Sequence, residues 1–127
     1  MRIHHIAVVC ASEENADRFY QSLLGLERIR SYPVSAELSN GLFGFERSFQ
    51  ACNYVKGDMN VEVFVMEESA VAPPNFYHIA LEVDNLEEFL KRCREMKVQI
   101  LQVPKGDKII TMIKDFDGNI FEIKETA

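Results

Sequence analysis

A histidine motif occurs twice in this chain of 127 residues, and the repeat restricts the fold more than any other feature. His5-Ile6-Ala7 and His78-Ile79-Ala80 each open an apolar run. Each run gives way to a residue that can cap a helix and then to an amphipathic pattern. The repeat predicts two modules of the same plan, at residues 1–70 and 75–127, within a single domain spanning residues 1–127.

Each module is expected to follow a β-α-β-β-β order. In the first module the expected elements are a strand at 2–10, a helix from the Ser12 cap to Gly25, a strand at 26–32 that Pro33 ends, and a hairpin of 49–55 and 60–66 around Lys56-Gly57-Asp58. In the second they are a strand at 76–83, a helix capped by Asp84 or Asn85 with Asp84 and Glu87 as a capping box, a strand at 98–103, a loop at 104–107, and a hairpin of 108–114 and 119–124. Two segments lie outside this plan, namely a linker at 67–75 and a loop or short helix at 34–46.

These elements predict an α+β fold in which two tandem βαβββ modules form curved mixed sheets around a metal-binding cleft, with the helices outside. The apolar residues Leu42, Phe43 and Phe45 in the 34–46 segment could cover a site, take part in a subunit contact, or fill the core.

Composition narrows the class of protein. An apolar fraction of 47% favours a compact globule, and a net charge of −6 argues against a nucleic-acid partner. No apolar run reaches the roughly 18 residues of a membrane span. Three widely spaced cysteines, Cys10, Cys52 and Cys93, suggest neither a disulfide framework nor a thiolate zinc site, so we expect reduced core thiols in a cytoplasmic protein.

Strand alternation selects the candidate site. His5, Glu62, His78 and Glu122 each lie on the strand face opposite the residues that pack against a helix, so all four are expected to point into the cleft. His4 is assigned to the helix-packing face or a strand end. A lone strand histidine or glutamate is more often structural than a ligand, but two such pairs in register with a duplicated motif indicate a site.

Two imidazoles and two carboxylates suit one divalent metal ion, Ni, Co, Zn, Mn or Fe, with positions left open for water or substrate. An open Lewis-acid position beside a carboxylate favours proton transfer next to a carbonyl group. Asn60, Phe64 and Met66 share the face of Glu62 and are candidates to line a substrate. Lys105 and Lys108 could meet an anionic tail, but a solvated loop is favoured.

The sequence resembles the vicinal oxygen chelate superfamily, which includes glyoxalase I, methylmalonyl-CoA epimerase, extradiol dioxygenases, fosfomycin-modifying enzymes and bleomycin-binding proteins. The resemblance covers almost the whole chain. It is carried by the two His-Ile-Ala motifs, Phe19-Tyr20, Leu24-Gly25, Lys56-Gly57-Asp58 leading to Val61-Glu62-Val63, Val83-Asp84, and Asp117-Gly118-Asn119-Ile120-Phe121-Glu122.

The resemblance implies metal ligation by His5, Glu62, His78 and Glu122, with Glu122 or Glu62 also acting as the base. Extradiol dioxygenases resemble the chain at only three of these ligands, and the bleomycin-binding relatives lack the metal set. Bacterial glyoxalase I usually carries an arginine where Val9 stands here, so glutathione is not favoured as the substrate. The usual Asp-Pro-Asp-Gly turn is Asp115-Phe116-Asp117-Gly118.

We therefore predict a metal-dependent lyase or isomerase of glyoxalase I or epimerase type that acts on a small 2-oxo or thioester substrate. The alternatives are a metal-dependent resistance enzyme or dioxygenase, and a catalytically silent module that binds a hydrophobic small molecule. A homodimer is expected, with the cleft formed either within one chain or between two.

Overall fold

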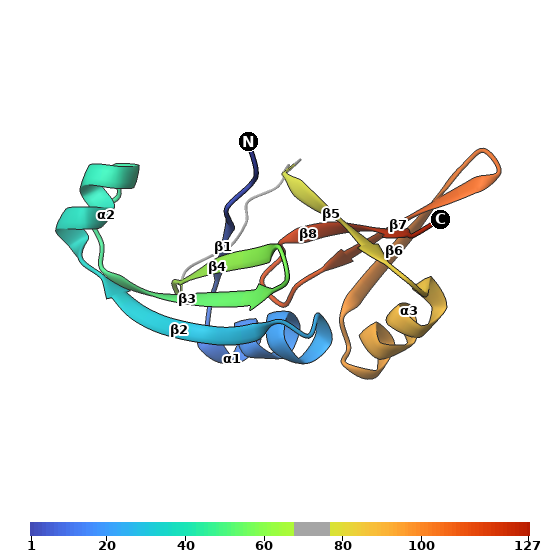
Figure 1. Ribbon diagram of the computed structural model, residues 1–127, viewed down its shortest axis with the longest axis horizontal. Coiled ribbons are helices and arrows are strands. Elements are labelled where there is room, and N and C mark those ends of the chain that lie inside the picture. The colour runs from blue at the N-terminus through green and yellow to red at the C-terminus, as the bar shows by residue number, and fades with distance from the viewer. Residues whose placement is uncertain (68–76) are drawn as a thin grey trace. The chain divides into compact units, whose positions relative to one another are not determined.

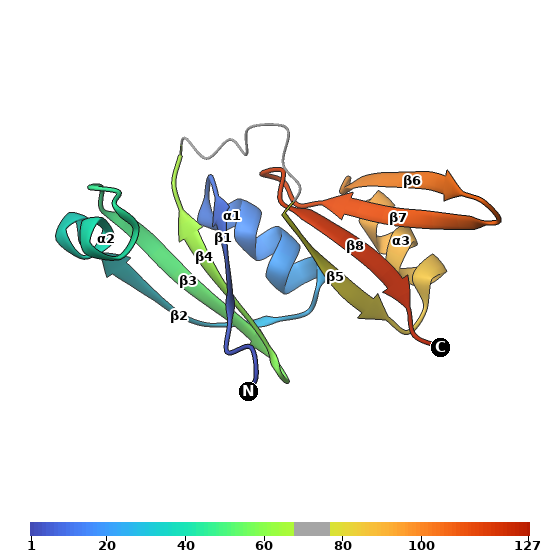
Figure 2. The same ribbon diagram turned by 90° about the horizontal axis from the view of Figure 1, so that it is seen from above.

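The chain folds into two units, Met1–Ser69 and Ala70–Ala127, in the computed structural model, which describes residues 1–67 and 77–127. The first unit contains β1 (Ile6–Cys10), α1 (Glu13–Ala16), η1 (Asp17–Leu23), β2 (Glu27–Val34), α2 (Ala36–Phe43), β3 (Phe49–Lys56) and β4 (Met59–Val65). The second contains β5 (His78–Val83), α3 (Leu86–Glu95), β6 (Gln99–Lys105), β7 (Lys108–Lys114) and β8 (Ile120–Glu125). Each unit is drawn with its own sheet and helices in Figures 1 and 2.

The two sheets have the same topology. The first has the strand order β1-β4-β3-β2 and the second β5-β8-β7-β6. In each sheet the first strand pairs in parallel with the last strand of the unit, and the other pairings are antiparallel. The α+β class and the two tandem βαβββ modules are thus confirmed, with α2 as an addition to the first module.

One face of the first sheet packs against the α1–η1 helix. Ser12 caps this helix by accepting a hydrogen bond from the backbone N–H of Asn15, and Gly25 follows its end with a φ of 76°. The apolar stripe of Ala16, Phe19, Tyr20 and Leu23 is completely buried, as are Val61 and Val63 of β4. The helix is α-helical only to Ala16 and π-helical from Asp17, which the sequence did not indicate.

The second unit repeats this arrangement with α3. Phe89, Leu90 and Cys93 of α3 are buried, and so are Phe121 and Ile123 of β8. Asn85 is the N-cap and accepts from the backbone N–H of Glu88, so the capping box expected of Asp84 and Glu87 is wrong. A cap is fixed by which residue has extended backbone geometry immediately before the helix, and here that residue is Asn85.

Two prolines that were expected to lie outside strands lie inside them. Pro33 is paired with Gln50 in β2, and Pro104 is paired with Ile109 in β6. Both strands are at the edge of their sheets, where a missing backbone N–H need not break a ladder. The predicted end of a strand at Pro33 is therefore wrong, and the predicted loop at 104–107 is confirmed only at Gly106 and Asp107, which form the turn between β6 and β7.

Three further expectations concern cysteines, membrane spans and the linker. Cys10, Cys52 and Cys93 are free and buried, as expected. Within residues 1–67 and 77–127, no helix combines the length and apolarity that a membrane crossing requires. The predicted linker at 67–75 falls almost entirely outside the described residues.

Candidate functional site

Glu62 and His5 come together where the start of β1 lies beside β4 in the first sheet. Ala7 of β1 is paired with Glu62 of β4, and His5 lies two residues before Ala7 on the same side of the chain. The Nε2 atom of His5 is 3.1 Å from Oε2 of Glu62, and the two side chains are 43% and 15% exposed. The sheet thus presents one imidazole and one carboxylate on the face opposite the helix.

Both carboxylate oxygens of Glu62 have a partner. Oε2 lies next to His5, and Oε1 accepts a hydrogen bond of 2.5 Å from the hydroxyl of Tyr32 in β2. Burial, together with the hydrogen bond to Glu62, raises the pKa of Tyr32. The hydroxyl therefore remains protonated at neutral pH and donates to the carboxylate.

A polar row across the first sheet supports this pair. Arg30, Asn53, Glu62 and Ala7 are successive cross-strand neighbours. The Nε–H of Arg30 donates to Oδ1 of Asn53 over 3.0 Å, and its guanidinium carbon lies 4.6 Å from the centre of the Tyr32 ring. Such contacts between a guanidinium and a ring restrain both groups.

A β-bulge places Arg30 in this row. The register between β2 and β3 shifts between Arg28 and Arg30. Arg28 contacts Asp17 and Glu13 on the helix side of the sheet, whereas Arg30 contacts Asn53. A bulge that redirects a side chain is a common device near functional sites.

The neighbouring histidine affects which nitrogen of His5 is available. His4 and His5 are both exposed and precede β1, which agrees with the strand-end position expected for His4. Their Nδ1 atoms are 2.9 Å apart, so one ring must donate to the other. When His5 donates from Nδ1, its Nε2 keeps the lone pair that a metal ion requires.

His78 and Glu122 form the equivalent pair in the second unit. Ala80 of β5 is paired with Glu122 of β8, and His78 lies two residues before Ala80, which repeats the offset of the first unit. Nε2 of His78 is 3.8 Å from Oε2 of Glu122, while Nζ of Lys124 is 3.4 Å from Oε1. The side chain of Glu122 is 22% exposed.

The surroundings of the two glutamates differ. In the second sheet the row containing Ala80 and Glu122 continues with Met112 and Leu101, where the first sheet has an amide and a guanidinium. Val103 occupies the position two residues along β6 from Leu101, and it is 53% exposed. Tyr32 holds the corresponding position on β2, so the second unit has an isopropyl group where the first has a hydroxyl donor.

The donor atoms fit a divalent metal ion. Two ligands that occupy adjacent positions of a roughly octahedral ion, at bond lengths of about 2.1 Å, are about 3 Å apart. The separation in the first pair, 3.1 Å, matches this value, and that in the second, 3.8 Å, is somewhat larger. An imidazole and a carboxylate are ligands for the metals that the sequence suggested.

The residues expected to line a substrate lie in different environments. Phe64 contacts Phe43 of α2 and Phe49 of β3, with ring centres 5.6 and 4.8 Å apart. Met66 lines a hollow of about 400 Å³ together with Val9, Phe45, Arg47, Ser48, Val65 and Glu67. Asn60 lines another of about 670 Å³ near His4 and Asp58, and its Oδ1 is buried without a hydrogen-bond partner among the described residues.

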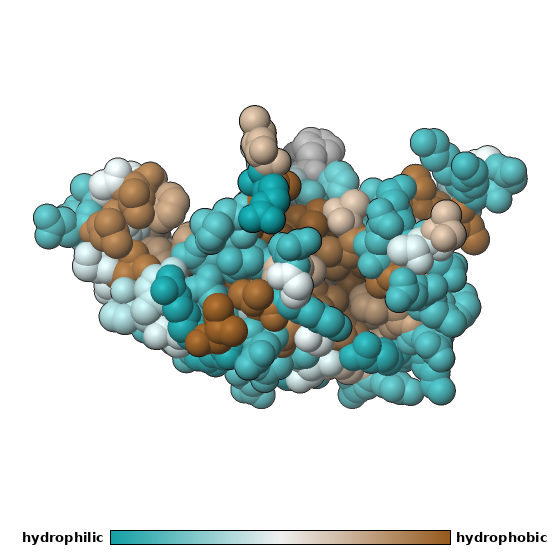
Figure 3. Space-filling view, viewed as in Figure 1, coloured by the Kyte–Doolittle hydropathy of each residue, from teal (hydrophilic) through white to brown (hydrophobic). Residues whose placement is uncertain are grey.

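The α2 helix carries an exposed apolar surface. Ser35 caps it and Gly44 ends it with a φ of 68°. Leu38, Leu42 and Phe43 are 51%, 62% and 58% exposed. Figure 3 shows hydrophobic surface over this helix, at the left. The short-helix interpretation of the 34–46 segment is confirmed, and plain core filling is not, because these side chains remain exposed.

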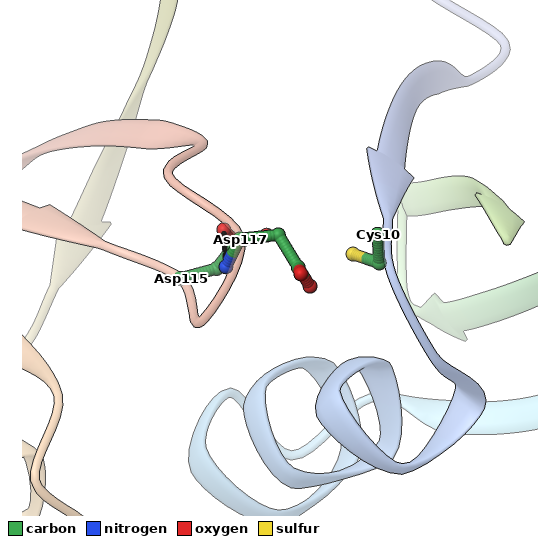
Figure 4. A group of neighbouring side chains, drawn as sticks. All are labelled: Cys10, Asp115 and Asp117. Atoms are coloured by element: carbon green, nitrogen blue, oxygen red, sulfur yellow. Dashed lines mark hydrogen bonds between the residues drawn. The ribbon is translucent and has the colours of Figure 1, made fainter. Parts of the chain in front are cut away.

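The turn between β7 and β8 is organised by its own aspartate. Asp115 is 5% exposed, and its Oδ1 accepts from the backbone N–H groups of Asp117 and Asn119 at 2.9 and 2.8 Å. Figure 4 shows Asp115 and Asp117 on this turn, and also draws Cys10, which ends β1 in the first unit. Asp115 therefore closes the turn even though Phe116 stands where the usual Asp-Pro-Asp-Gly turn has a proline.

Sequence reasoning missed three residues of the first site, namely Tyr32, Arg30 and Asn53. Asn53 could have been found, because a polar residue in the middle of the buried run Phe49–Lys56 is unusual. Tyr32 and Arg30 gave no such signal, since their face depends on the bulge.

The comparisons with known proteins agree with this architecture. The sequence matches the family model of the Glyoxalase/Bleomycin resistance protein/Dioxygenase superfamily over residues 4–111. A search of curated proteins found no match.

Solved structures with the same fold include a glyoxalase family protein, a fosfomycin resistance protein and a glyoxalase I. The glyoxalase family protein from Enterococcus faecalis is 21% identical, with 96% of this chain and 95% of that chain covered and a TM-score of 0.73. The fosfomycin resistance protein FosX from Listeria monocytogenes, in a complex with Mn(II) and sulfate, is 18% identical, with coverages of 99% and 90% and a TM-score of 0.73. The trypanothione-dependent glyoxalase I of Leishmania major is 16% identical, with coverages of 98% and 86% and a TM-score of 0.71.

Proposed function

Because this chain belongs to the Glyoxalase/Bleomycin resistance protein/Dioxygenase superfamily, we propose that it is a metal-dependent lyase or isomerase that moves a proton next to a carbonyl group. One observation carries the proposal, namely that a histidine and a glutamate meet at the same strand offset in both units. The pair is kept in both units although the residues around it differ, which favours a shared role for the histidine and the glutamate.

The proposed ligands are His5, Glu62, His78 and Glu122, which together would hold one divalent ion. The Listeria FosX structure contains Mn(II), which supports a divalent metal in a chain of this fold. When bound, the ion would supply a Lewis acid that withdraws electrons from a carbonyl oxygen. The two histidines would act as neutral ligands through Nε2.

We assign the proton transfer to Glu122. Both oxygens of Glu62 are engaged, by Tyr32 and by His5, whereas the contacts of Glu122 with His78 and Lys124 are longer. A carboxylate with looser contacts can turn between a ligand position and a substrate carbon. Small 2-oxo compounds or thioesters are the proposed substrates, since both acidify a neighbouring C–H bond.

The test combines metal analysis with proton exchange. Purified wild-type protein is expected to contain stoichiometric metal and to exchange hydrogen for deuterium at carbons next to the carbonyl of small 2-oxo compounds and thioesters, followed by NMR. Glu122→Gln should lose both the metal and the exchange, because an amide is a weak ligand and no base. Unchanged metal content in Glu122→Gln would contradict the proposal, and Glu87→Gln on the exposed side of α3 serves as the matched control.

A resistance enzyme is the second candidate, favoured by the fosfomycin resistance proteins among the structures that share the fold. Oxygen consumption with Fe(II) would instead indicate a dioxygenase, against which the glutamate at position 62 argues. Thiol transfer to an epoxide, with no proton exchange on 2-oxo compounds, would select the resistance enzyme. A homodimer in the cytoplasm remains a prediction.

A further inference from the structure

We propose that Tyr32 is a positioning residue that fixes the carboxylate of Glu62 for metal binding, an inference that rests on the proposed function. The hydroxyl of Tyr32 donates to Oε1 of Glu62 over 2.5 Å. The other oxygen, Oε2, is the one beside Nε2 of His5. With Oε1 engaged, Glu62 offers Oε2 to the ion and is held in one orientation.

Tyr32 is itself held in place. The guanidinium of Arg30 lies 4.6 Å from the centre of its ring, and Arg30 donates to Asn53, which is only 7% exposed. Tyr32 and Arg30 are on the edge strand β2, whereas Asn53 is on β3. The network therefore connects the edge of the sheet to the glutamate on β4, and a donor held in this way loses little freedom when it binds the carboxylate.

The second unit has no counterpart to this donor among the described residues. At the corresponding positions of its sheet stand Val103, Leu101 and Met112. Oε1 of Glu122 instead faces Lys124, whose side chain is 59% exposed. The two glutamates thus have different roles. Glu62 is held in one orientation as a metal ligand, whereas Glu122 remains able to rotate.

Partners that orient a metal ligand typically change metal affinity about 10- to 100-fold when they are removed. Tyr32→Phe removes the hydroxyl but keeps the ring beneath Arg30. We expect the variant to bind Co²⁺ at least about 10-fold more weakly than wild type by isothermal titration calorimetry. The visible absorption of bound Co²⁺ should also change, because Glu62 can then rotate or bind through both oxygens.

Tyr54→Phe is the matched control. The Tyr54 hydroxyl also donates to a carboxylate, that of Asp17 at 2.6 Å, but on the helix side of the sheet. A purely structural effect of losing such a hydrogen bond would act through folding. The control is therefore expected to lower the thermal unfolding midpoint of the metal-free protein while leaving Co²⁺ affinity and absorption unchanged.

Arg30→Met is the second variant, and it keeps the test decisive even when Tyr32→Phe fails to fold. It leaves the hydroxyl but removes the cation over the ring, and it should weaken Co²⁺ binding about 2- to 5-fold. Wild-type affinity and absorption in a folded Tyr32→Phe, or in Arg30→Met when Tyr32→Phe is unfolded, would overturn the role of Tyr32 and leave the proposed function standing. A wild-type chain that binds no Co²⁺ would overturn the proposed function, and this inference with it.

Discussion

The hydroxyl of Tyr54 links the sheet of the first unit to its helix through a hydrogen bond. The ring is completely buried, and the hydroxyl donates to Asp17 in η1. Arg28 of β2 approaches the same carboxylate at 3.2 Å and also pairs with Glu13. Burial, followed by the hydrogen bond to Asp17, raises the pKa of Tyr54. The network is therefore intact when the tyrosine is neutral and the aspartate is charged.

Replacing Tyr54 with phenylalanine should lower the free energy of unfolding by about 1–3 kcal/mol, the usual cost of losing a hydrogen bond to a charged group. Urea unfolding monitored by circular dichroism measures the change. Since the pKa is raised in the fold, the stabilisation is present below the ordinary pKa of 10.0 and is lost as pH rises above it. The variant should thus lose less stability than wild type between neutral pH and pH values above 10.0, and a steeper loss would contradict this account.

Residues on strands explain what could be predicted of the site. Alternation placed His5, Glu62, His78 and Glu122 correctly relative to the helix-packing faces, because each strand has one buried side. The partners of Glu62 could not be predicted in the same way. Tyr32 reaches Glu62 only after a register shift in β2, and nothing in the local sequence marks such a shift.

The sequence predicted which helices and strands form better than it predicted where they begin and end. Both hairpins were predicted well, because a turn with Gly57 or Gly118 separates clear alternating runs. The ends of β2 and β6 were not, because the effect of a proline depends on whether its strand lies at a sheet edge. Edge position is a property of the assembled sheet and cannot be seen in the strand alone.

The cap of α3 provides a direct test at this scale. Asn85→Ala removes the oxygen that accepts from the N–H of Glu88, and it should lower the free energy of unfolding by about 1 kcal/mol. Asp84→Ala is the control, since the Asp84 carboxylate accepts from the exposed hydroxyl of Thr126 and Asn85, not Asp84, caps α3. A larger loss in Asp84→Ala than in Asn85→Ala, measured by chemical denaturation, would show that the cap lies at the other residue.

At the scale of the whole molecule, the duplication is visible in sheet topology, helix packing and the offset of the histidine from the glutamate. Within residues 1–67 and 77–127, the additions lie in the first unit, where α2 presents an apolar surface and Tyr32, Arg30 and Asn53 surround the glutamate. Two copies of one plan have thus acquired different surroundings around the same pair of side chains. The repeat was evident in the sequence, whereas the difference between the copies was not.

We propose that the two histidine–glutamate pairs act together on one ion. The stoichiometry of Co²⁺ binding should be measured by calorimetry for wild type, His5→Ala and His78→Ala, with Glu87→Gln on the exposed side of α3 as the control. We predict one ion per wild-type chain, a loss of at least about 10-fold in affinity for either ligand variant, and wild-type binding in Glu87→Gln. Two ions per chain, or undiminished binding after loss of either His5 or His78, would contradict the account.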